Sequence, residues 1–470
     1  SHHVYRFSIL NTNLLTHFEI KHQQVNLYMS SPAKIVLIIL DGLGDTTHKI
    51  DGKSGTCLQL SDHPTLDTLA QTGKVGLMDS VSPGFPCGSD TAHLSLFGYS
   101  PFKYYNGRGA FEALGGGMPM EPGDIAFKSN FSTMYGENVK YRRCDRHFEV
   151  EGPILCKDLD GLKIPGYPEV QVSVVYATEH RCAVRIRAKG LSDKISGTDP
   201  IHDGLDLLKS KPLDDSKEAQ YTANVVNALS DAFRKALSQH PINQKRKEEG
   251  KELANVILLR GPGMRLNVET FEQRHGIKSF LIAPTAIIAG LGISVGLDII
   301  KVKGATGDMD SNYNVKMLAA AEALDGDKYD MGIIHIKGTD DASHDGKPEK
   351  KMELIERADA AVHLLIEKLS AIEQKSNQKF IVGIVADHTT SSTWLDHSFE
   401  PIPVCFSEVS TVAKSLGLPY KESQRLIEPD NVKRYTEVDA FRGSLGRFCG
   451  SKLIQLLFNL AGRNYVSHND

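Results

Sequence analysis

Three short hydrophobic runs in this chain each lead into polar residues that can carry chemistry. The runs are KIVLIIL at 34–40, MGIIHI at 331–336 and FIVGIVA at 380–386. Apolar runs of this length, bounded by glycine and polar residues, are typical of buried parallel strands. The first ends at Asp41, the second leads to Asp340 and His344, and the third ends at Asp387 and His388. Because open α/β sheets bind ligands just beyond the carboxyl ends of their strands, we expect these clusters to meet at one sheet edge.

The middle of the chain follows a different pattern. Residues 171–176 (QVSVVY), 182–187 (CAVRIR) and 255–259 (NVILL) indicate strands, and apolar side chains at helical spacing indicate a helix at 221–237. The charged stretch 241–251 (PINQKRKEEGK) predicts a solvated loop. Because the polar clusters lie in residues 41–89 and 340–397, we predict an inserted domain at 123–275 within a discontinuous domain at 29–122 and 276–470. The fold class is α/β, a mostly parallel sheet flanked by helices with a smaller inserted α/β domain.

Helical spacing returns after the insertion. It predicts helices at 315–324 and 352–369, and a tail helix at 452–460 that packs on the sheet. Residues 1–28 are polar, lack an apolar signal core and are interpreted as an N-terminal extension, with Met29 as the native start and Ser1-His2-His3 as a residual tag.

Composition excludes several classes of protein. At 470 residues the chain is long enough for two domains. A net charge of -4 gives no footprint for nucleic acid, and no apolar run approaches the roughly 20 residues of a membrane span. Seven scattered cysteines without a C-x-x-C pair favour a reducing compartment, so we expect a cytoplasmic protein. Its oligomeric state stays open.

The residue types at the strand ends suit a two-metal site. Carboxylates and imidazoles bind Mn, Mg, Zn and Co, whereas thiolate sites need paired cysteines. Two ions roughly 3.5–4 Å apart can hold the attacking and leaving oxygens of a phosphoryl group in line. Ser89 is the candidate nucleophile, because it follows Gly88 in a tight turn and precedes a helical stretch at 92–96 whose N-terminus favours a phosphoserine. The candidate metal ligands are Asp41, Ser89, Asp340, His344, Asp387, His388 and His397.

Several longer motifs carry a resemblance to a known family. They are DGLGD at 41–45, GSDTAHLSLFGY at 88–99, GRGAFEALG at 107–115, TDDASHD at 339–345, ADH at 386–388, and His397. The chain resembles the archaeal-type, 2,3-bisphosphoglycerate-independent phosphoglycerate mutases of the alkaline phosphatase superfamily over nearly all of residues 29–460. The resemblance implies that Asp340, His344 and His397 hold one metal, while Asp41, Ser89, Asp387 and His388 hold the other. It further implies Mn2+, with Mg2+, Co2+ or Zn2+ as alternatives, and no 2,3-bisphosphoglycerate.

The inserted domain is expected to bind the substrate through basic residues. Phosphate and carboxylate groups match the planar fork of arginine. The candidates are Arg142, Arg143, Arg146, His180, Arg181 and Arg260, together with Lys303, which resembles a lysine that contacts the transferring phosphoryl group. The sequence departs from the family pattern at Tyr141, Cys144 and Asp145, where aspartate, alanine and glycine are usual, and at Lys128, where arginine is usual.

Plainer roles compete with each of these. A single aspartate after a strand is often a helix cap, Ser89 alone can be one as well, and any single arginine can be a surface charge. His93 has either a packing or a functional role. Asp45, Asp345 and Asp396 are candidates to orient ligand histidines. We expect the four histidines that have no motif to lie at the surface; these are His48, His63, His202 and His363.

The resemblance implies an isomerase that interconverts 3-phosphoglycerate and 2-phosphoglycerate through a phosphoserine on Ser89. A metal-dependent phosphatase of the same superfamily, in which water attacks the phosphoserine, is one alternative, and a sugar-phosphate mutase is another. A catalytically inactive binding protein is disfavoured, because all seven metal positions are present. An arginine-rich insertion favours the mutase, since it can retain glycerate and exclude water.

Overall fold

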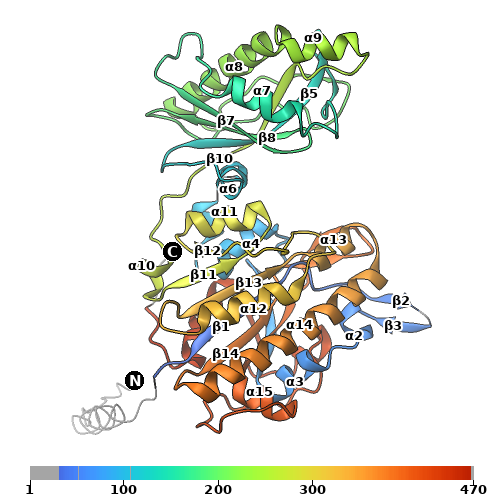
Figure 1. Ribbon diagram of the computed structural model, residues 1–470, viewed down its shortest axis with the longest axis vertical. Helices are drawn as coiled ribbons and strands as arrows, with labels where there is room; N and C mark the ends of the chain where they lie inside the picture. Colours follow the sequence, from blue (N-terminus) through green and yellow to red (C-terminus); the bar gives the residue numbers. More distant parts are fainter. Residues whose placement is uncertain (1–30, 51, 106, 467–470) are drawn as a thin grey trace, which may run out of the picture.

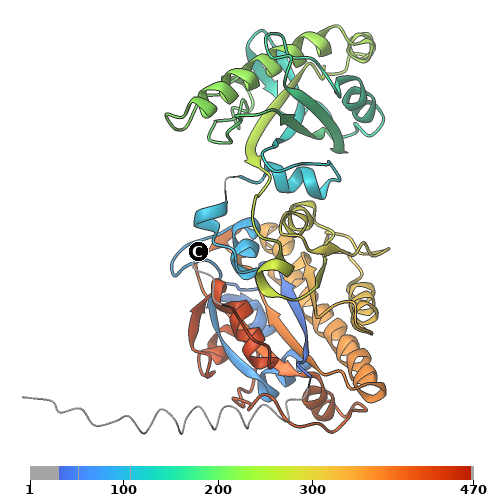
Figure 2. The same ribbon diagram turned by 90° about the vertical axis from the view of Figure 1, so that its left-hand side faces the viewer.

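The structure is a computed structural model that describes residues 31–50, 52–105 and 107–466. The proposed N-terminal extension and the start at Met29 lie outside the described residues. The chain forms two bodies stacked along the long axis of the molecule (Figure 1), and the view turned by 90° shows the same arrangement (Figure 2). Residues from both ends of the chain build the larger body, and the middle of the chain builds the smaller one.

The larger body is built on a sheet to which the described residues contribute eight strands. Their order across the sheet is β12 (Asp298–Ile299), β11 (Ser279–Ile282), β13 (Met331–Ile336), β1 (Lys34–Leu40), β14 (Phe380–Val385), β17 (Ile402–Glu408), β4 (Lys74–Asp79) and β18 (Arg447–Cys449). The first five are parallel to one another, and β17 is antiparallel to both of its neighbours. The predicted mostly parallel α/β fold is confirmed.

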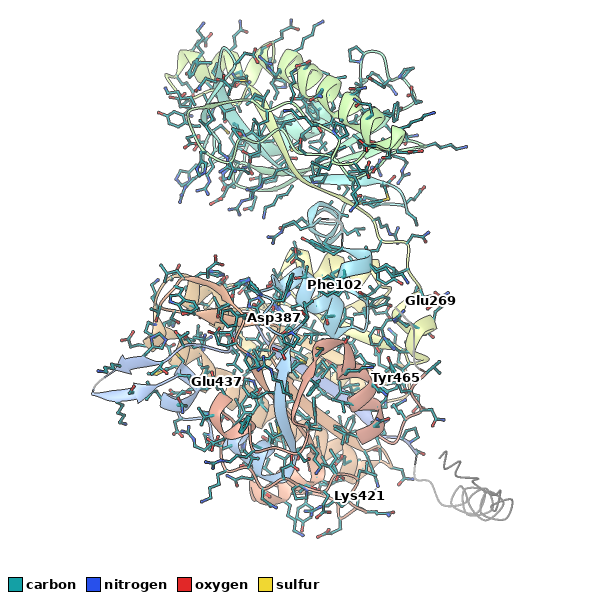
Figure 3. All side chains as sticks on the ribbon, turned by 180° about the vertical axis from the view of Figure 1, so that it is seen from behind. Phe102, Glu269, Asp387, Lys421, Glu437 and Tyr465 are labelled. Carbon is teal, nitrogen blue, oxygen red and sulfur yellow. The ribbon has the colours of Figure 1, made fainter. Side chains whose placement is uncertain are left out.

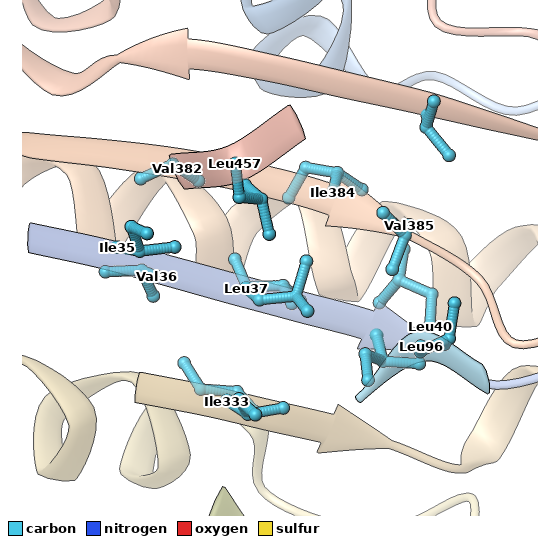
Figure 4. Close-up of a cluster of buried hydrophobic side chains, with 14 of the residues drawn as sticks. Ile35, Val36, Leu37, Leu40, Leu96, Ile333, Val382, Ile384, Val385 and Leu457 are labelled. Atoms are coloured by element: carbon cyan, nitrogen blue, oxygen red, sulfur yellow. The ribbon is translucent and has the colours of Figure 1, made fainter. Parts of the chain in front are cut away.

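Burial explains why the central strands read as continuous apolar runs. Every residue of β1, β13 and β14 is buried. Figure 4 shows side chains of these three strands packed together with Leu96 and Leu457. Leu457 belongs to α17 (Leu453–Leu460), so the prediction that the tail helix packs on the sheet is confirmed.

Helices cover the sheet and complete the same core. Four of them contact one another along one side, and α12 and α14 cross the front of the sheet in Figure 1. These four are α3 (Pro64–Thr72), α12 (Tyr313–Leu324), α14 (Pro348–Lys375) and α15 (Val409–Ser415). Shorter elements complete the body: β2 (His48–Ile50), β3 (Lys53–Gly55), α2 (Cys57–Leu60), α5 (Pro101–Tyr104), α10 (Phe271–His275) and α16 (Glu437–Ala440).

The smaller body has a sheet and a core of its own. Among the described residues its six strands are β7 (Gln171–Thr178), β8 (Arg181–Arg187), β5 (Ile125–Tyr135), β6 (Asn138–Tyr141), β9 (Leu205–Asp206) and β10 (Val256–Met264). The strands pair antiparallel, and α7 (Glu151–Leu159), α8 (Lys217–Ser238) and α9 (Pro241–Glu248) accompany them. All of these elements fall within 123–275, and the domain boundaries themselves stay a prediction.

Two helices lie between the bodies. α6 (Gly109–Gly115) packs on α11 (Ala286–Ser294) of the larger body and also against β5 and β10 of the smaller one (Figure 1). The backbone contact is close, because a Cβ on Gly115 would lie 1.8 Å from the Ala286 carbonyl oxygen and one on Gly109 would lie 2.1 Å from that of Ala126. The glycines of the GRGAFEALG motif therefore allow this helix to pack tightly on both bodies.

Two predictions are wrong. The charged stretch at 241–251 is not a solvated loop, because residues 241–248 form α9, which Pro241 starts at N1 under a His240 cap. One face of α9 is buried and carries Arg246, which binds Asp145 and Glu151 of the same body. His63 is not a surface residue, since it is 0% exposed and its ring contacts Asp67 and the Tyr435 carbonyl. No helix in the described ranges is long and apolar enough to cross a membrane.

Candidate metal centre and active site

The sheet brings the three polar clusters to one edge. Strands β13, β1 and β14 are adjacent and parallel, with Leu40 opposite Ile336 and Ile39 opposite Val385. Asp41 and Asp387 therefore follow neighbouring strand ends, and Asp340 lies in the first turn of α13 (Gly338–His344). Figure 3 shows Asp387 in the half of the larger body that is nearer to the smaller body.

Ser89 and His397 reach the same place from other elements. α4 (Ser89–Leu96) begins at Ser89, whose Oγ lies 3.1 Å from Nε2 of His388. His397 lies on β16 (Asp396–Ser398), which pairs with β15 (Thr389–Ser391), and its ring stacks on that of His388 at 3.7 Å between centroids. The helix starts three residues earlier than the predicted 92–96, so that Ser89 sits in its first turn, where backbone N–H groups and the helix dipole favour an anion.

The side-chain donors form two sets with similar spacing. In the first set, Nε2 of His344 lies 3.2 Å from Nε2 of His397 and 3.4 Å from Oδ2 of Asp340. In the second, Nε2 of His388 lies 3.1 Å from Oγ of Ser89, 3.3 Å from Oδ2 of Asp387 and 3.6 Å from Oδ1 of Asp41. Two ligands of one tetrahedral ion stand roughly 3.4 Å apart when each bond is about 2.1 Å long. The spacing within each set therefore fits donors that share an ion.

Two buried oxygens support this interpretation. Oδ1 of Asp41 and Oδ2 of Asp387 are buried and have no hydrogen-bond partner in the described structure. A buried carboxylate oxygen without a partner is costly, and a divalent cation removes that cost. The set of three carboxylates, three imidazoles and one hydroxyl is the donor chemistry that Mn, Mg, Co and Zn accept.

Backbone carbonyls fix two of the histidines. Nδ1 of His344 donates to the Leu395 carbonyl at 2.9 Å, and Nδ1 of His397 donates to the Cys87 carbonyl at 2.9 Å. Leu395 adopts a left-handed conformation with φ 62°, which is strained for a leucine and aims its carbonyl at His344. Both rings consequently turn Nε2 toward Asp340.

Gly42 leaves the space that the site needs. Its φ is +62°, and a Cβ there would lie 2.5 Å from Oγ1 of Thr390 and 2.7 Å from Oδ1 of Asp340. Its amide donates to Oδ1 of Asp387 at 3.0 Å. No other residue type satisfies both conditions without moving a candidate ligand.

Burial and nearby charges shift the pKa values of the cluster. Burial raises the pKa of Asp387 to about 6, and burial together with Asp387 raises that of Asp41. Burial opposes the charge of Asp340, but hydrogen bonds from His344 and His397 and the charge of Lys337 hold its pKa well below the usual range. Asp340 in turn raises the pKa of His344 to about 9, whereas burial lowers that of His388 to about 3. Burial thus disfavours the charged form of two carboxyl groups, and a bound cation would offset this.

Sequence reasoning missed Lys337 and His335. Nζ of Lys337 lies 3.2 Å from Oδ2 of Asp41 and contacts Asp340 more closely still, while Nε2 of His335 lies 3.0 Å from the same oxygen of Asp41. Lys337 directly follows an apolar strand and precedes Asp340 by three residues, a signal that could have been used. His335 lies inside the apolar run, where nothing in the pattern distinguishes it from a core residue.

The neighbours of the ligands fall into two groups. Asp45 and His93 are buried, and Nδ1 of His93 lies 2.7 Å from the Ser89 carbonyl and 3.7 Å from Oδ2 of Asp387. Asp45 binds Nζ of Lys351 at 3.1 Å behind the cluster. Asp396 accepts the backbone N–H of His397, whereas Asp345 pairs with Lys347 at the surface.

Arg142 of the smaller body is held by an aspartate. Its Nε and one terminal nitrogen each donate to Asp199 at 2.6 Å, in a fork-to-fork pair, and Asp199 is buried. Arg260 lies beside Arg142 and is half-buried. Burial lowers the pKa of Arg260, and the positive charges of Arg142 and Arg108 lower it further, whereas the charge of Asp199 raises it. The structure therefore gathers Arg142, Arg260 and Arg108 at one end of the smaller body.

The other substrate candidates differ in exposure. His180 is buried, and burial together with Arg181 lowers its pKa to about 4. Arg143, Arg146 and Arg181 are exposed, and Arg143 and Arg181 lie close enough to His180 to act on it. Lys303 lies on an exposed loop of the larger body, next to a hollow that Glu322 and Tyr329 also line. Lys337, rather than Lys303, is the lysine that the structure places among the metal-ligand candidates.

Comparisons with known proteins agree on one family. A family model described as 2,3-bisphosphoglycerate-independent phosphoglycerate mutase matches residues 70–243. The chain is 40% identical over 432 residues to the protein of that name from Saccharolobus solfataricus, covering 92% of this chain and 98% of the relative. It is 38% identical over 436 residues to the one from Ignicoccus hospitalis, with the same coverage of 92% and 98%.

Two solved structures superpose on nearly the whole chain. The cofactor-independent phosphoglycerate mutase of Thermoplasma acidophilum superposes with a TM-score of 0.65 at 29% identity, covering 92% of this chain and 100% of that one. A protein from Pyrococcus horikoshii superposes with a TM-score of 0.72 at 29% identity, covering 93% and 100%.

Proposed function

The chain belongs to the 2,3-bisphosphoglycerate-independent phosphoglycerate mutases, and from that premise we propose that it interconverts 3-phosphoglycerate and 2-phosphoglycerate through a phosphoserine on Ser89 beside two divalent ions. The observation that supports this most is the presence of two donor sets with internal spacings of 3.1–3.6 Å, one of which includes Oγ of Ser89. The reaction is a step of glycolysis and gluconeogenesis, and we place the enzyme in the cytoplasm, where its free cysteines stay reduced.

Each donor set would hold one ion. Asp340, His344 and His397 would hold one ion, and Asp41, Ser89, Asp387 and His388 the other. Bound ions would lower the pKa of the serine hydroxyl and neutralise charge on the phosphoryl oxygens. Mn2+ is the ion we propose, and the O/N donor set also accepts Mg2+, Co2+ or Zn2+.

The chain's own residues supply the rest. Oγ of Ser89 loses its proton and forms the bond to phosphorus while the substrate P–O bond breaks, and the leaving glycerate oxygen takes up a proton. The N-terminus of α4 favours the phosphoserine. Lys337 holds a positive charge between Asp41 and Asp340. Arg142, Arg143, Arg146, His180, Arg181 and Arg260 are proposed to hold the glycerate while it turns. Returning the phosphoryl group to the other hydroxyl completes the isomerisation without bisphosphoglycerate.

A phosphatase is the second candidate, because the donor sets alone suit both reactions. The test is turnover of 3-phosphoglycerate with Mn2+, with and without 2,3-bisphosphoglycerate, together with mass spectrometry of the acid-quenched Ser89 peptide. We expect 2-phosphoglycerate without bisphosphoglycerate, phosphate on Ser89 and neither product after EDTA. Ser89→Ala should abolish both activities. Release of inorganic phosphate in place of 2-phosphoglycerate would favour the phosphatase, and full turnover in metal-free protein would overturn the proposal.

A further inference from the structure

Thr390 touches one candidate ligand of each metal and is not itself a ligand. Its side chain is fully buried on β15, and Oγ1 lies 2.6 Å from Oδ1 of Asp340 and 3.1 Å from Nδ1 of His388. Its backbone pairs with His397 across the β15–β16 hairpin. One threonine thus lies against three candidate ligands from both sets.

The hydrogen bonds can run in one direction only. Thr390 Oγ1 donates to Oδ1 of Asp340, in the role that a metal-binding carboxylate requires, because such a carboxylate accepts hydrogen bonds and has none to give. The single hydroxyl hydrogen of Thr390 must therefore point to Oδ1 of Asp340, which leaves an oxygen lone pair facing His388. Nδ1 of a neutral His388 must then carry the ring hydrogen and donate it to Thr390.

This direction sets the chemistry of the opposite ring nitrogen. A neutral imidazole with hydrogen on Nδ1 has a bare Nε2, and only a bare nitrogen binds a metal. Nε2 of His388 faces Ser89, Asp387 and Asp41 at 3.1, 3.3 and 3.6 Å. The tautomer that Thr390 selects is therefore the one that a metal at the second set requires.

Buried charges fix the backbone of Thr390. Nζ of Lys351, which is fully buried, donates to the Thr390 carbonyl at 3.0 Å and to the Gly44 carbonyl at 2.8 Å. Asp45 balances the lysine charge at 3.1 Å and accepts further bonds from Ser392. The hydroxyl of Thr390 is held by packing and charge that lie outside the donor sets.

We propose that Thr390 is a positioning residue that links the two metal sites, because its hydroxyl anchors Asp340 at one site and imposes the metal-binding tautomer of His388 at the other. The inference rests on the proposed two-metal function. Through these two hydrogen bonds, one side chain would influence metal affinity at both sites.

The test compares Thr390→Val, Thr390→Ser and Thr389→Val by calorimetric titration of metal-free protein with Mn2+. Thr390→Val keeps the shape but removes the hydroxyl, and we expect Mn2+ affinity to fall roughly 10- to 100-fold, as for other residues that orient metal ligands. Thr390→Ser restores the hydroxyl and should recover most of the affinity. Thr389→Val is the matched control, because Thr389 is equally buried on the same strand but donates to the Glu400 carbonyl.

Two further readouts separate positioning from a general loss of structure. We expect kcat of Thr390→Val to fall while KM stays near the wild-type value, since the smaller body is untouched. In metal-free wild type labelled with 15N-histidine, His388 should appear as the Nδ1–H tautomer, and this measurement needs no folded variant. An Nε2–H tautomer in wild type, or equal Mn2+ affinities in Thr390→Val and Thr389→Val, would overturn the inference. Wild-type protein that binds no Mn2+ would instead overturn the proposed function.

Discussion

The three buried carboxylates at the strand ends repel one another, and a bound cation would reduce this repulsion. Asp41, Asp340 and Asp387 are all buried, and within the described ranges Lys337 is the lysine that contacts Asp41 and Asp340. The ammonium lies on the side of Asp41 and Asp340, and the rings of His344 and His397 also face Asp340, so Asp387 has the least compensation for its burial. Burial therefore opposes the charge of Asp41 and Asp387 and raises the pKa of both, and a divalent cation would offset that cost.

Asp340→Asn should remove one metal and leave the fold intact. The amide oxygen still accepts the Thr390 hydroxyl, but the side chain loses the charge that holds a cation against His344 and His397. Bound Mn2+ after dialysis, measured by plasma mass spectrometry, should fall from two ions per chain to one. Turnover should fall by a factor of about 1,000.

Asp341→Asn is the control for that prediction. Asp341 lies on the same helix, one residue further on, and is partly exposed. This variant should keep both ions. Two ions retained in Asp340→Asn would show that Asp340 is not a ligand.

At the scale of elements, the strand ends were predictable because a strand buried on both faces appears in the sequence as a continuous apolar run. The runs before Asp41, Asp340 and Asp387 contain hardly any polar residue, and parallel neighbours bring their ends together. Thr390 and Lys351 were not predictable, since their roles depend on contacts with residues about 40 to 50 positions away. α9 was missed because Arg246 is charged, and only the tertiary contacts with Asp145 and Glu151 show that it is buried.

Arg246→Met tests the packing of α9. The Arg246 side chain is 1% exposed, donates to the Glu252 carbonyl at 2.7 Å and lies 5.3 Å from the ring centre of Phe148. Removing the guanidinium leaves Asp145 and Glu151 without their partner, which lowers the free energy of unfolding. Because both carboxylates are partly exposed and keep some contact with water, we expect this loss to be about 2–4 kcal/mol. Urea unfolding followed by far-UV circular dichroism measures it.

Two comparisons locate the effect of that substitution. Lys245→Met, on the exposed face of α9, should change the unfolding free energy by less than about 0.5 kcal/mol. The single tryptophan, Trp394, lies in the larger body. Arg246→Met should therefore change the urea midpoint of the Trp394 fluorescence less than the urea midpoint of the circular dichroism. An identical change in urea midpoint by both probes would mean that the two bodies unfold as one unit.

At the scale of the whole molecule, stability should depend on one buried carboxyl away from the site. Glu373 on α14 is 4% exposed and accepts the Phe380 amide at 2.9 Å. Burial, with Glu408 nearby, raises its pKa from 4.5 to about 7. The folded chain therefore holds a proton that the unfolded chain releases, and this contribution is fully present below about pH 4.5 and is lost as the pH rises through about 7.

Glu373→Gln should remove that dependence. The amide oxygen keeps the bond from Phe380 without the charge, so the variant should gain about 1–3 kcal/mol at pH 8 and little at pH 5. Thermal unfolding at both values measures it, with Glu367→Gln on the exposed face of α14 as the control. Equal gains at the two pH values would contradict the pKa shift.

The last prediction tests whether the two bodies divide the reaction between them, as proposed. Each body has its own hydrophobic core, the donor sets lie in the larger one, and Arg260 lies in the smaller one. If the smaller body only holds the glycerate, Arg260→Gln should still form phosphoserine on Ser89. It should lose roughly 10- to 100-fold in mutase kcat/KM, as expected for one charged hydrogen bond.

Water that reaches the loosened site should raise the ratio of inorganic phosphate released to 2-phosphoglycerate formed. Arg234→Gln is the matched control, because Arg234 belongs to the same body but pairs with Glu137 at its surface. It should leave turnover and the product ratio unchanged. Ser89→Ala should form neither 2-phosphoglycerate nor inorganic phosphate. This result distinguishes loss of the chemical step from loss of glycerate binding. A normal ratio and normal turnover in Arg260→Gln would mean that the smaller body does not retain the glycerate through this arginine.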